Sequence, residues 1–359
     1  MSNTLQAISQ AGVAIWLDDL SRDRLQNNSL ADLVQQDNVV GVTTNPSIFA
    51  NAIGKSTLYR EDIKKYANLS IEEVITQLTT DDVRSACDLL QNTYLQTKHL
   101  DGRVSIEVDP RFARDTQATI NQGKHLWKII DRPNLLIKVP ATVEGLPAIT
   151  SLIADGISVN VTLIFSVERY KQVMHAYAAG LEKLLAAGGS ANQVFSVASF
   201  FISRLDTSVD ALLPESSTLR GCAAIANATM AYEAFLNFQK SQLWQSLQMS
   251  GCNLQRPLWA STGVKDPKYD PNRYVMELIA PNTVNTMPEQ TLLSVKNTGI
   301  YNYEKMTDDL AIAKSNLAKL ALAGIDLDKI TVDLEIDGVK KFESSWMELM
   351  SSVRAVVTG

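Results

Sequence analysis

Residues Leu135 to Thr142 read LLIKVPAT, a short apolar run that a single lysine, Lys138, interrupts. Short apolar runs bounded by turn residues are typical of strands that are buried in a parallel sheet. A lysine has little reason to lie in such a strand, because removing an unpaired charge from water is costly. The stretch therefore predicts a buried parallel strand whose lysine serves a function.

Similar short runs recur along the chain and alternate with segments of helical length. In Asp115 to Ile130 and Ser166 to Ala186, apolar residues recur at the three- and four-residue spacing of a helix. This alternation indicates a parallel α/β fold, either an open sheet or a closed barrel. The eight runs are Val13 to Asp18, Val39 to Thr43, Val104 to Val108, Leu135 to Val139, Ile157 to Thr162, Val194 to Ser199, Pro257 to Ser261 and Asn282 to Met287.

Polar residues stand near the carboxyl end of nearly every run. This pattern distinguishes a closed barrel from an open sheet. Successive strand residues point to opposite faces, so Asn160 and Thr162 share a face opposite Val159 and Val161. A closed barrel gathers such polar faces at one mouth, whereas an open sheet spreads them apart. The pattern favours a (β/α)8 TIM barrel with additional helices. The polar residues are Asp18, Thr43, Asn45, Glu107, Lys138, Asn160, Thr162, Ser199 and Ser261.

The remaining segments are expected to be helical and to belong to the same unit. Ile48 to His99 is long enough for two or three helices, and Asn302 to Leu322 and Gly338 to Val357 also have a helical pattern. We expect one barrel domain over residues 1–359, with the helices from about residue 300 packing on the barrel.

A lysine among apolar strand residues, with acids nearby, points to amine catalysis. Burial disfavours the charged ammonium, and a neutral amine can attack a ketone to form an iminium that accepts electrons during carbon–carbon cleavage. Asp18 and Glu107 are the natural proton carriers, and no cofactor is needed. Each residue taken alone has a structural alternative: Lys138 as a lysine reaching solvent, and the two acids as partners of Arg103 or Arg111.

Composition and charge exclude several other classes of function. The net charge of −6 disfavours nucleic-acid binding, and no segment has the length of uninterrupted apolar sequence that crosses a membrane. The three histidines lack metal-binding spacing, so we expect no metal. The N-terminus lacks a secretion signal, and three distant cysteines are typical of reduced thiols in a cytoplasmic protein.

Five motifs in one order along the chain resemble the transaldolase family, from about residue 8 to residue 290. They are TTNPS (Thr43 to Ser47), VSIEVDPR (Val104 to Arg111), LLIKVPAT (Leu135 to Thr142), VNVTLIFS (Val159 to Ser166) and SFFISRLD (Ser199 to Asp206). The resemblance implies an enzyme of the non-oxidative pentose phosphate pathway that works through a lysine Schiff base. Such an enzyme moves a dihydroxyacetone unit from sedoheptulose 7-phosphate to glyceraldehyde 3-phosphate, giving erythrose 4-phosphate and fructose 6-phosphate.

The resemblance also implies a role for each matching residue. Lys138 is the Schiff-base lysine, and Asp18 accepts the proton of the C4 hydroxyl, with neighbouring Asp19 as its rival. Glu107 acts with Thr162 through a shared water when the carbinolamine forms and dehydrates. The dihydroxyacetone unit is held by Thr43, Asn45, Asn160 and Ser199, with the aromatic Phe201 beside it.

Phosphate binding is implied for Arg204, although a structural pair with Asp206 is its alternative. Where the family often has a second arginine, after the seventh strand, this chain offers Ser261 and Lys265. A lysine contacts phosphate as a point charge and not as a bidentate fork. The resemblance further implies a homodimer.

Two rival functions stay open. A class I fructose-6-phosphate aldolase would release dihydroxyacetone instead of transferring it, although Glu107 and the length of the chain favour transfer. A non-catalytic sugar-phosphate-binding barrel would have no need of Asp18, Glu107 and Lys138 together.

Overall fold

The structure is a computed structural model that describes residues 4–301, 306 and 309–358. In these ranges eight parallel strands form a closed barrel, in which neighbours in the sequence are neighbours in space. Strand β1 pairs with β8 and closes the ring, so the prediction of a TIM barrel is confirmed. The strands are β1 Val13–Leu17, β2 Val39–Val42, β3 Arg103–Glu107, β4 Leu135–Pro140, β5 Val159–Ile164, β6 Ser196–Phe201, β7 Arg256–Ala260 and β8 Thr283–Met287.

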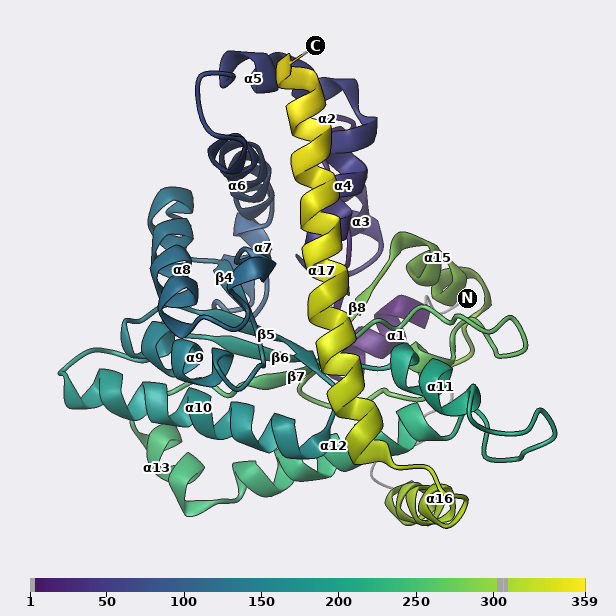
Figure 1. Cartoon of the computed structure of the whole chain (residues 1–359). Helices are drawn as coiled ribbons and strands as arrows, with labels where there is room; N and C mark the ends of the chain where they lie inside the picture. The colour runs from purple at the N-terminus through teal and green to yellow at the C-terminus, as the bar shows by residue number, and fades with distance from the viewer. Residues whose placement is uncertain (1–3, 302–305, 307–308, 359) are drawn as a thin grey trace.

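Helices surround the barrel (Figure 1). Two of them begin where the sequence indicates, because Asp115 and Ser166 each accept a hydrogen bond from a backbone N–H of the first turn. The helices are α1 Thr4–Gln10, α2 Arg22–Gln26, α3 Ser29–Gln36, α4 Pro46–Lys55, α5 Arg60–Lys65, α6 Ile71–Leu89, α7 Gln91–Gln96, α8 Thr116–Ile130, α9 Gly145–Ala154, α10 Val167–Ala186, α11 Ser203–Asp210, α12 Ala223–Gln239, α13 Gln242–Met249, α14 Arg273–Met276, α15 Glu289–Thr298, α16 Leu310–Leu322 and α17 Leu327–Thr358, with short 3₁₀ turns η1 Thr57–Tyr59 and η2 Pro110–Phe112.

The segment after β2 is divided into more helices than the sequence pattern indicates. The segment between residues 46 and 99, all of it described, holds four α-helices (α4 to α7) and η1, so the expectation of two or three was wrong. The extra breaks come from local caps: the Ser56 hydroxyl accepts from Leu58 N–H, and Ser70 forms a capping box with Glu73. Of the helix expected over Asn302 to Leu322, residues 302–305, 307 and 308 lie outside the described residues, and α16 covers Leu310–Leu322.

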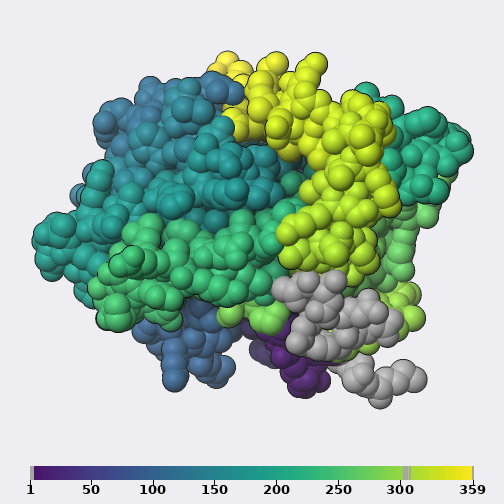
Figure 2. Space-filling view, turned by 90° about the horizontal axis from the view of Figure 1, so that it is seen from below, coloured from purple at the N-terminus to yellow at the C-terminus, as the bar shows by residue number. Residues whose placement is uncertain are grey.

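The C-terminal helix α17 begins well before Gly338, where the sequence pattern placed its start. A Cβ on this glycine would lie 3.0 Å from Cδ2 of Leu163 at the end of β5, so the glycine permits close packing and does not end a helix. In Figure 1, α17 runs across the barrel, and its contacts include α4, α5, α6, α11 and β5. Figure 2 shows the C-terminal segment as a continuous ridge against the rest of the molecule.

The barrel interior is filled by side chains beneath the mouth. Trp16 on β1 is fully buried and pairs in register with Gly41 on β2. A Cβ on Gly41 would lie 2.5 Å from Cε2 of the indole, which is closer than atoms can approach. Asp18 and Thr43 come directly after the ends of these two strands, two positions beyond Trp16 and Gly41, so this packing supports the polar layer above it.

We predict that Gly41→Ala destabilises the protein by about 1–3 kcal/mol, because the added methyl overpacks the barrel interior against Trp16. Urea unfolding followed by circular dichroism measures the change. Gly54→Ala is the matched control, since a Cβ there meets its nearest atom, Oγ of Ser352, at an ordinary 3.4 Å. Equal stability of the two variants would contradict the packing described.

Candidate active site

Lys138 lies inside the barrel mouth, in the middle of a polar layer. The strand register pairs Lys138 with Glu107 on β3 and with Asn160 on β5. Its Nζ donates a hydrogen bond to the Thr44 carbonyl oxygen at 2.9 Å and lies 3.5 Å from Oε2 of Glu107. Only 4% of the lysine is exposed, so it does not reach bulk solvent.

Glu107 is a buried carboxyl group with few partners. Burial raises the pKa of Glu107 to about 7, although the nearby Lys138 opposes the rise. Both of its carboxyl oxygens, and the hydroxyl of Thr162, are buried and form no hydrogen bond with the described residues. Arg103 and Arg111, the structural alternatives, bind other groups: Arg103 donates to backbone carbonyls and Arg111 pairs with Asp109. The carboxyl group is thus free to exchange a proton near neutral pH.

Asp18 and Asp19 have different surroundings. The Thr43 hydroxyl donates to Oδ1 of Asp18 at 2.7 Å, and burial raises the pKa of Asp18, against the opposing charge of Lys138. Asp19 instead accepts a hydrogen bond from Nε of Arg24 at 2.7 Å. Of the two acids, Asp18 alone lines the cavity described below.

A chain of hydrogen bonds holds the floor of the site. Asn160 donates from Nδ2 to the Ser105 hydroxyl at 2.9 Å and accepts at Oδ1 from the Ser199 hydroxyl at 2.7 Å. All three side chains are buried, so the chain fixes the orientation of the amide. Ser105 was not among the predicted site residues, although it shares a strand face with Glu107.

A cavity of about 220 Å³ opens above this floor. Glu107, Asn160 and Thr162 are buried and do not line it, but the register sets Glu107 and Asn160 on either side of Lys138, and Thr162 pairs with Pro140, two residues further along β4. The structure therefore brings the predicted site residues together at one barrel mouth. The lining residues are Asp18, Thr43, Asn45, Ser47, Lys138, Ser199, Phe201, Arg204, Ala260, Ser261, Gly263, Lys265, Thr286, Pro288 and Phe342.

Two of the lining residues, Asn45 and Ser261, also shape the backbone at the cavity. Oδ1 of Asn45 accepts from Ile48 N–H at 3.0 Å and so caps the start of α4. Ser261 has a left-handed backbone with φ of 57°, and its hydroxyl lies 3.0 Å from that of Ser203. Such a backbone turns the chain sharply at the end of β7.

Arg204 stands at one side of the cavity, over the ring of Phe201 with 5.5 Å between the guanidinium carbon and the ring centroid. Its Nη1 is buried without a hydrogen-bond partner among the described residues, and burial lowers the pKa of Arg204. Asp206, its structural alternative, accepts from Ala224 N–H and the Tyr274 hydroxyl. This guanidinium can receive an anion, and Lys265 in the cavity lining adds a second positive charge.

Phe342 is a site residue that the sequence motifs missed. It lies on α17, is 4% exposed, and its ring centroid is 5.9 Å from Nζ of Lys138. The four-residue spacing of Gly338, Phe342 and Trp346 could have indicated one buried helix face, but not what that face covers.

Neither a metal-binding group nor a membrane-spanning helix is found in the part of the chain that the structure describes. No group of three or more His, Cys, Asp or Glu side chains there could hold a metal ion. No helix there is long and apolar enough to span a bilayer.

Comparisons with known proteins agree in pointing to one family. A family model described as Transaldolase/Fructose-6-phosphate aldolase matches residues 15–353. A protein of Mycolicibacterium smegmatis named Transaldolase is 53% identical over 357 residues, covering 98% of this chain and 96% of the relative. Proteins of the same name from Mycobacterium tuberculosis strain H37Rv and Saccharopolyspora erythraea are 50% and 51% identical, with 98% of this chain covered in each case and 96% and 97% of the relatives. Because the family model and these relatives span nearly the whole sequence, the chain belongs to the transaldolase family.

Proposed function

We propose that this enzyme transfers a dihydroxyacetone unit from sedoheptulose 7-phosphate to glyceraldehyde 3-phosphate, giving erythrose 4-phosphate and fructose 6-phosphate. The observation that carries the proposal is a buried amine, Lys138, which lies 3.5 Å from Glu107 in a cavity that Asp18 also lines. The relatives named Transaldolase support the same reaction class, a transferase of the pentose phosphate pathway.

The first step joins the donor ketose to Lys138. Nζ attacks the C2 carbonyl carbon and forms a carbinolamine, and the C2–O bond then breaks as the hydroxyl leaves as water. Glu107 supplies the proton for this departure, with Thr162 holding a shared water, and a pKa near neutrality suits a group that must both give and take a proton. The product is an iminium at C2.

The second step breaks the C3–C4 bond. Asp18 takes the proton of the C4 hydroxyl, C4 becomes the aldehyde of the departing aldose phosphate, and the bonding electrons move into the iminium. The three-carbon fragment stays on Lys138 as an enamine. C3 of the enamine then attacks the carbonyl carbon of the second aldehyde phosphate, whose oxygen takes the proton back from Asp18, and hydrolysis of the new iminium releases the product ketose.

Substrate binding follows from the remaining cavity residues. Thr43, Asn45 and Ser199 line the cavity and, with Asn160 in the floor, which accepts from the Ser199 hydroxyl, offer hydrogen bonds to the hydroxyls of the three-carbon unit; Phe201 lies beside it. Arg204, whose Nη1 is without a partner among the described residues, binds the phosphate, with Ser261 and Lys265 at a neighbouring strand end.

The domain organisation, assembly, location and partners of the protein are also part of the proposal. We infer that residues 1–359 form one domain, because α17 contacts α4 and α16 contacts α12 of the barrel shell. Homodimer assembly, a cytoplasmic location and the absence of a nucleic-acid partner or cofactor rest on the family resemblance and on the composition of the chain.

Borohydride trapping tests the identity of the reacting amine. With fructose 6-phosphate present, reduction should leave a stable three-carbon adduct on the wild-type chain and none on Lys138→Ala, as intact mass spectrometry can measure. Lys171→Ala is the control, because Lys171 is 52% exposed on α10 and is not among the residues that line the cavity, so trapping should stay intact. An adduct of equal yield on Lys138→Ala would refute the assignment.

Paired substitutions distinguish the two adjacent aspartates. Asp18→Asn should lower kcat by about 10²–10⁴-fold, the usual contribution of a proton-transferring side chain. Asp19→Asn should cost less than about tenfold, because its carboxylate is held by Arg24 outside the cavity lining. A coupled assay from fructose 6-phosphate and erythrose 4-phosphate measures both, and a larger loss in Asp19→Asn would reverse the roles.

The pH dependence tests Glu107 as the proton donor. Its pKa is raised to about 7, so the carboxyl is protonated below that pH and loses its proton above it. We predict that kcat/KM falls as pH rises through about 7, and that Glu107→Gln removes this limb while lowering the rate. Asp19→Asn should keep the fall in kcat/KM as pH rises through about 7. If the fall persists in Glu107→Gln, it arises from another group and Glu107 is not the proton donor.

A further inference from the structure

We propose that Phe342, from the C-terminal helix α17, determines whether the three-carbon intermediate on Lys138 is transferred to an acceptor or released as dihydroxyacetone. The inference rests on the proposed Schiff-base function and assigns to the C-terminal segment a direct part in the outcome of the reaction.

The ring of Phe342 closes the cavity beside the reacting nitrogen. It is one of the cavity's lining residues, together with Lys138, Asp18 and Arg204, and its centroid lies 5.9 Å from Nζ. The side chain is almost fully buried although it comes from a helix outside the barrel. An aromatic group from outside the barrel thus forms one wall of the catalytic cavity.

Contacts on either side of Phe342 fix its position over the mouth. One helical turn before it, Gly338 packs against Leu163 and Phe165 at the end of β5. Nearly one turn after it, the Ser345 hydroxyl lies 2.7 Å from that of Ser47 in the first turn of α4. Residues four apart share a helix face, so Gly338, Phe342 and Trp346 all face the barrel.

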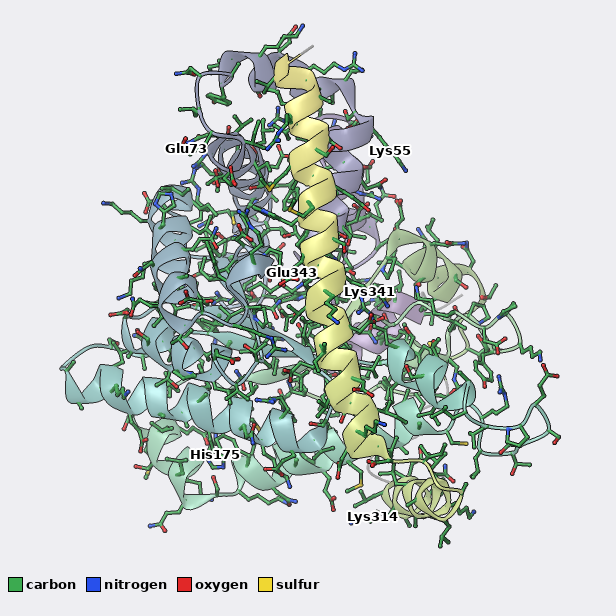
Figure 3. All side chains as sticks on the ribbon, viewed as in Figure 1. Lys55, Glu73, His175, Lys314, Lys341 and Glu343 are labelled. Carbon is green, nitrogen blue, oxygen red and sulfur yellow. The ribbon has the colours of Figure 1, made fainter. Side chains whose placement is uncertain are left out.

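Further contacts hold α17 in this place. Glu335 pairs with Arg169 of α10 at 3.3 Å, and both side chains are largely buried. The neighbours of Phe342 along the chain, Lys341 and Glu343, are labelled in Figure 3, and the Lys341 side chain is 59% exposed. Phe342 therefore stands between the reacting nitrogen and the solvent-exposed outer side of the helix.

The enamine formed after cleavage has two competing fates. If C3 takes a proton from water, an iminium of dihydroxyacetone results; water then adds to C2, the C2–N bond breaks and dihydroxyacetone leaves. If C3 attacks an aldehyde, the unit is transferred. An apolar ring beside Nζ keeps water from the fragment, which slows both the protonation of C3 and the addition of water to C2. Exclusion of water therefore favours transfer.

The experiment compares transfer with release in variants of Phe342. With fructose 6-phosphate as donor, release of dihydroxyacetone is measured without acceptor and transfer is measured with erythrose 4-phosphate. The ratio of release to transfer should rise about tenfold in Phe342→Ala and about threefold in Phe342→Leu, which keeps part of the apolar bulk. Met347→Ala is the control, because this side chain is 55% exposed on the same helix and should leave the ratio unchanged.

Each outcome either supports or overturns the role of Phe342. If release and transfer fall together and the ratio stays at the wild-type value, Phe342 is only a packing residue and the proposal is overturned. If Phe342→Ala fails to fold, the ratio in Phe342→Leu alone decides between the two roles. Failure of the Schiff-base function would be distinct, because the wild-type chain would then give no borohydride adduct.

Discussion

The site depends on one arrangement: an amine and a carboxyl group that adjacent parallel strands hold side by side, out of water. The β3–β4 register places Glu107 beside Lys138, and neither residue can change its place without breaking strand pairing. Water would screen this pair and hydrate both groups, whereas the barrel mouth leaves them few partners other than each other and a substrate. The floor of hydrogen bonds through Asn160 and the packing of Trp16 against Gly41 keep the arrangement rigid.

Much of this was predictable from the sequence because the strands are short and regular. A strand's two-residue period fixes which side chains share a face, and parallel strands bring their carboxyl ends to one mouth. Glu107, Lys138 and Asn160 were therefore expected to meet, and the register aligns them. Family likeness then supplied roles that spacing alone leaves open.

The features that could not be predicted depend on contacts between distant parts of the chain. A helical period shows that Phe342 is buried, but only the tertiary structure shows that α17 crosses the mouth and places it near Nζ of Lys138. Likewise, the sequence alone could not decide which of the adjacent residues Asp18 and Asp19 acts in the site. The difference comes from Arg24, which pairs with the Asp19 carboxylate. The number of helices between residues 46 and 99 was missed because serine caps divide the segment into shorter helices.

If Lys138 forms an iminium with the donor, the C2 oxygen of that donor is lost to water. Oxygen exchange at C2 measures this step without an acceptor or a trapping reagent. In water enriched in heavy oxygen, the wild-type chain should exchange the C2 oxygen of fructose 6-phosphate much faster than Lys138→Ala does, as mass spectrometry of the recovered sugar would show. Exchange at the same rate with both proteins, alongside wild-type transfer activity, would contradict an iminium on Lys138.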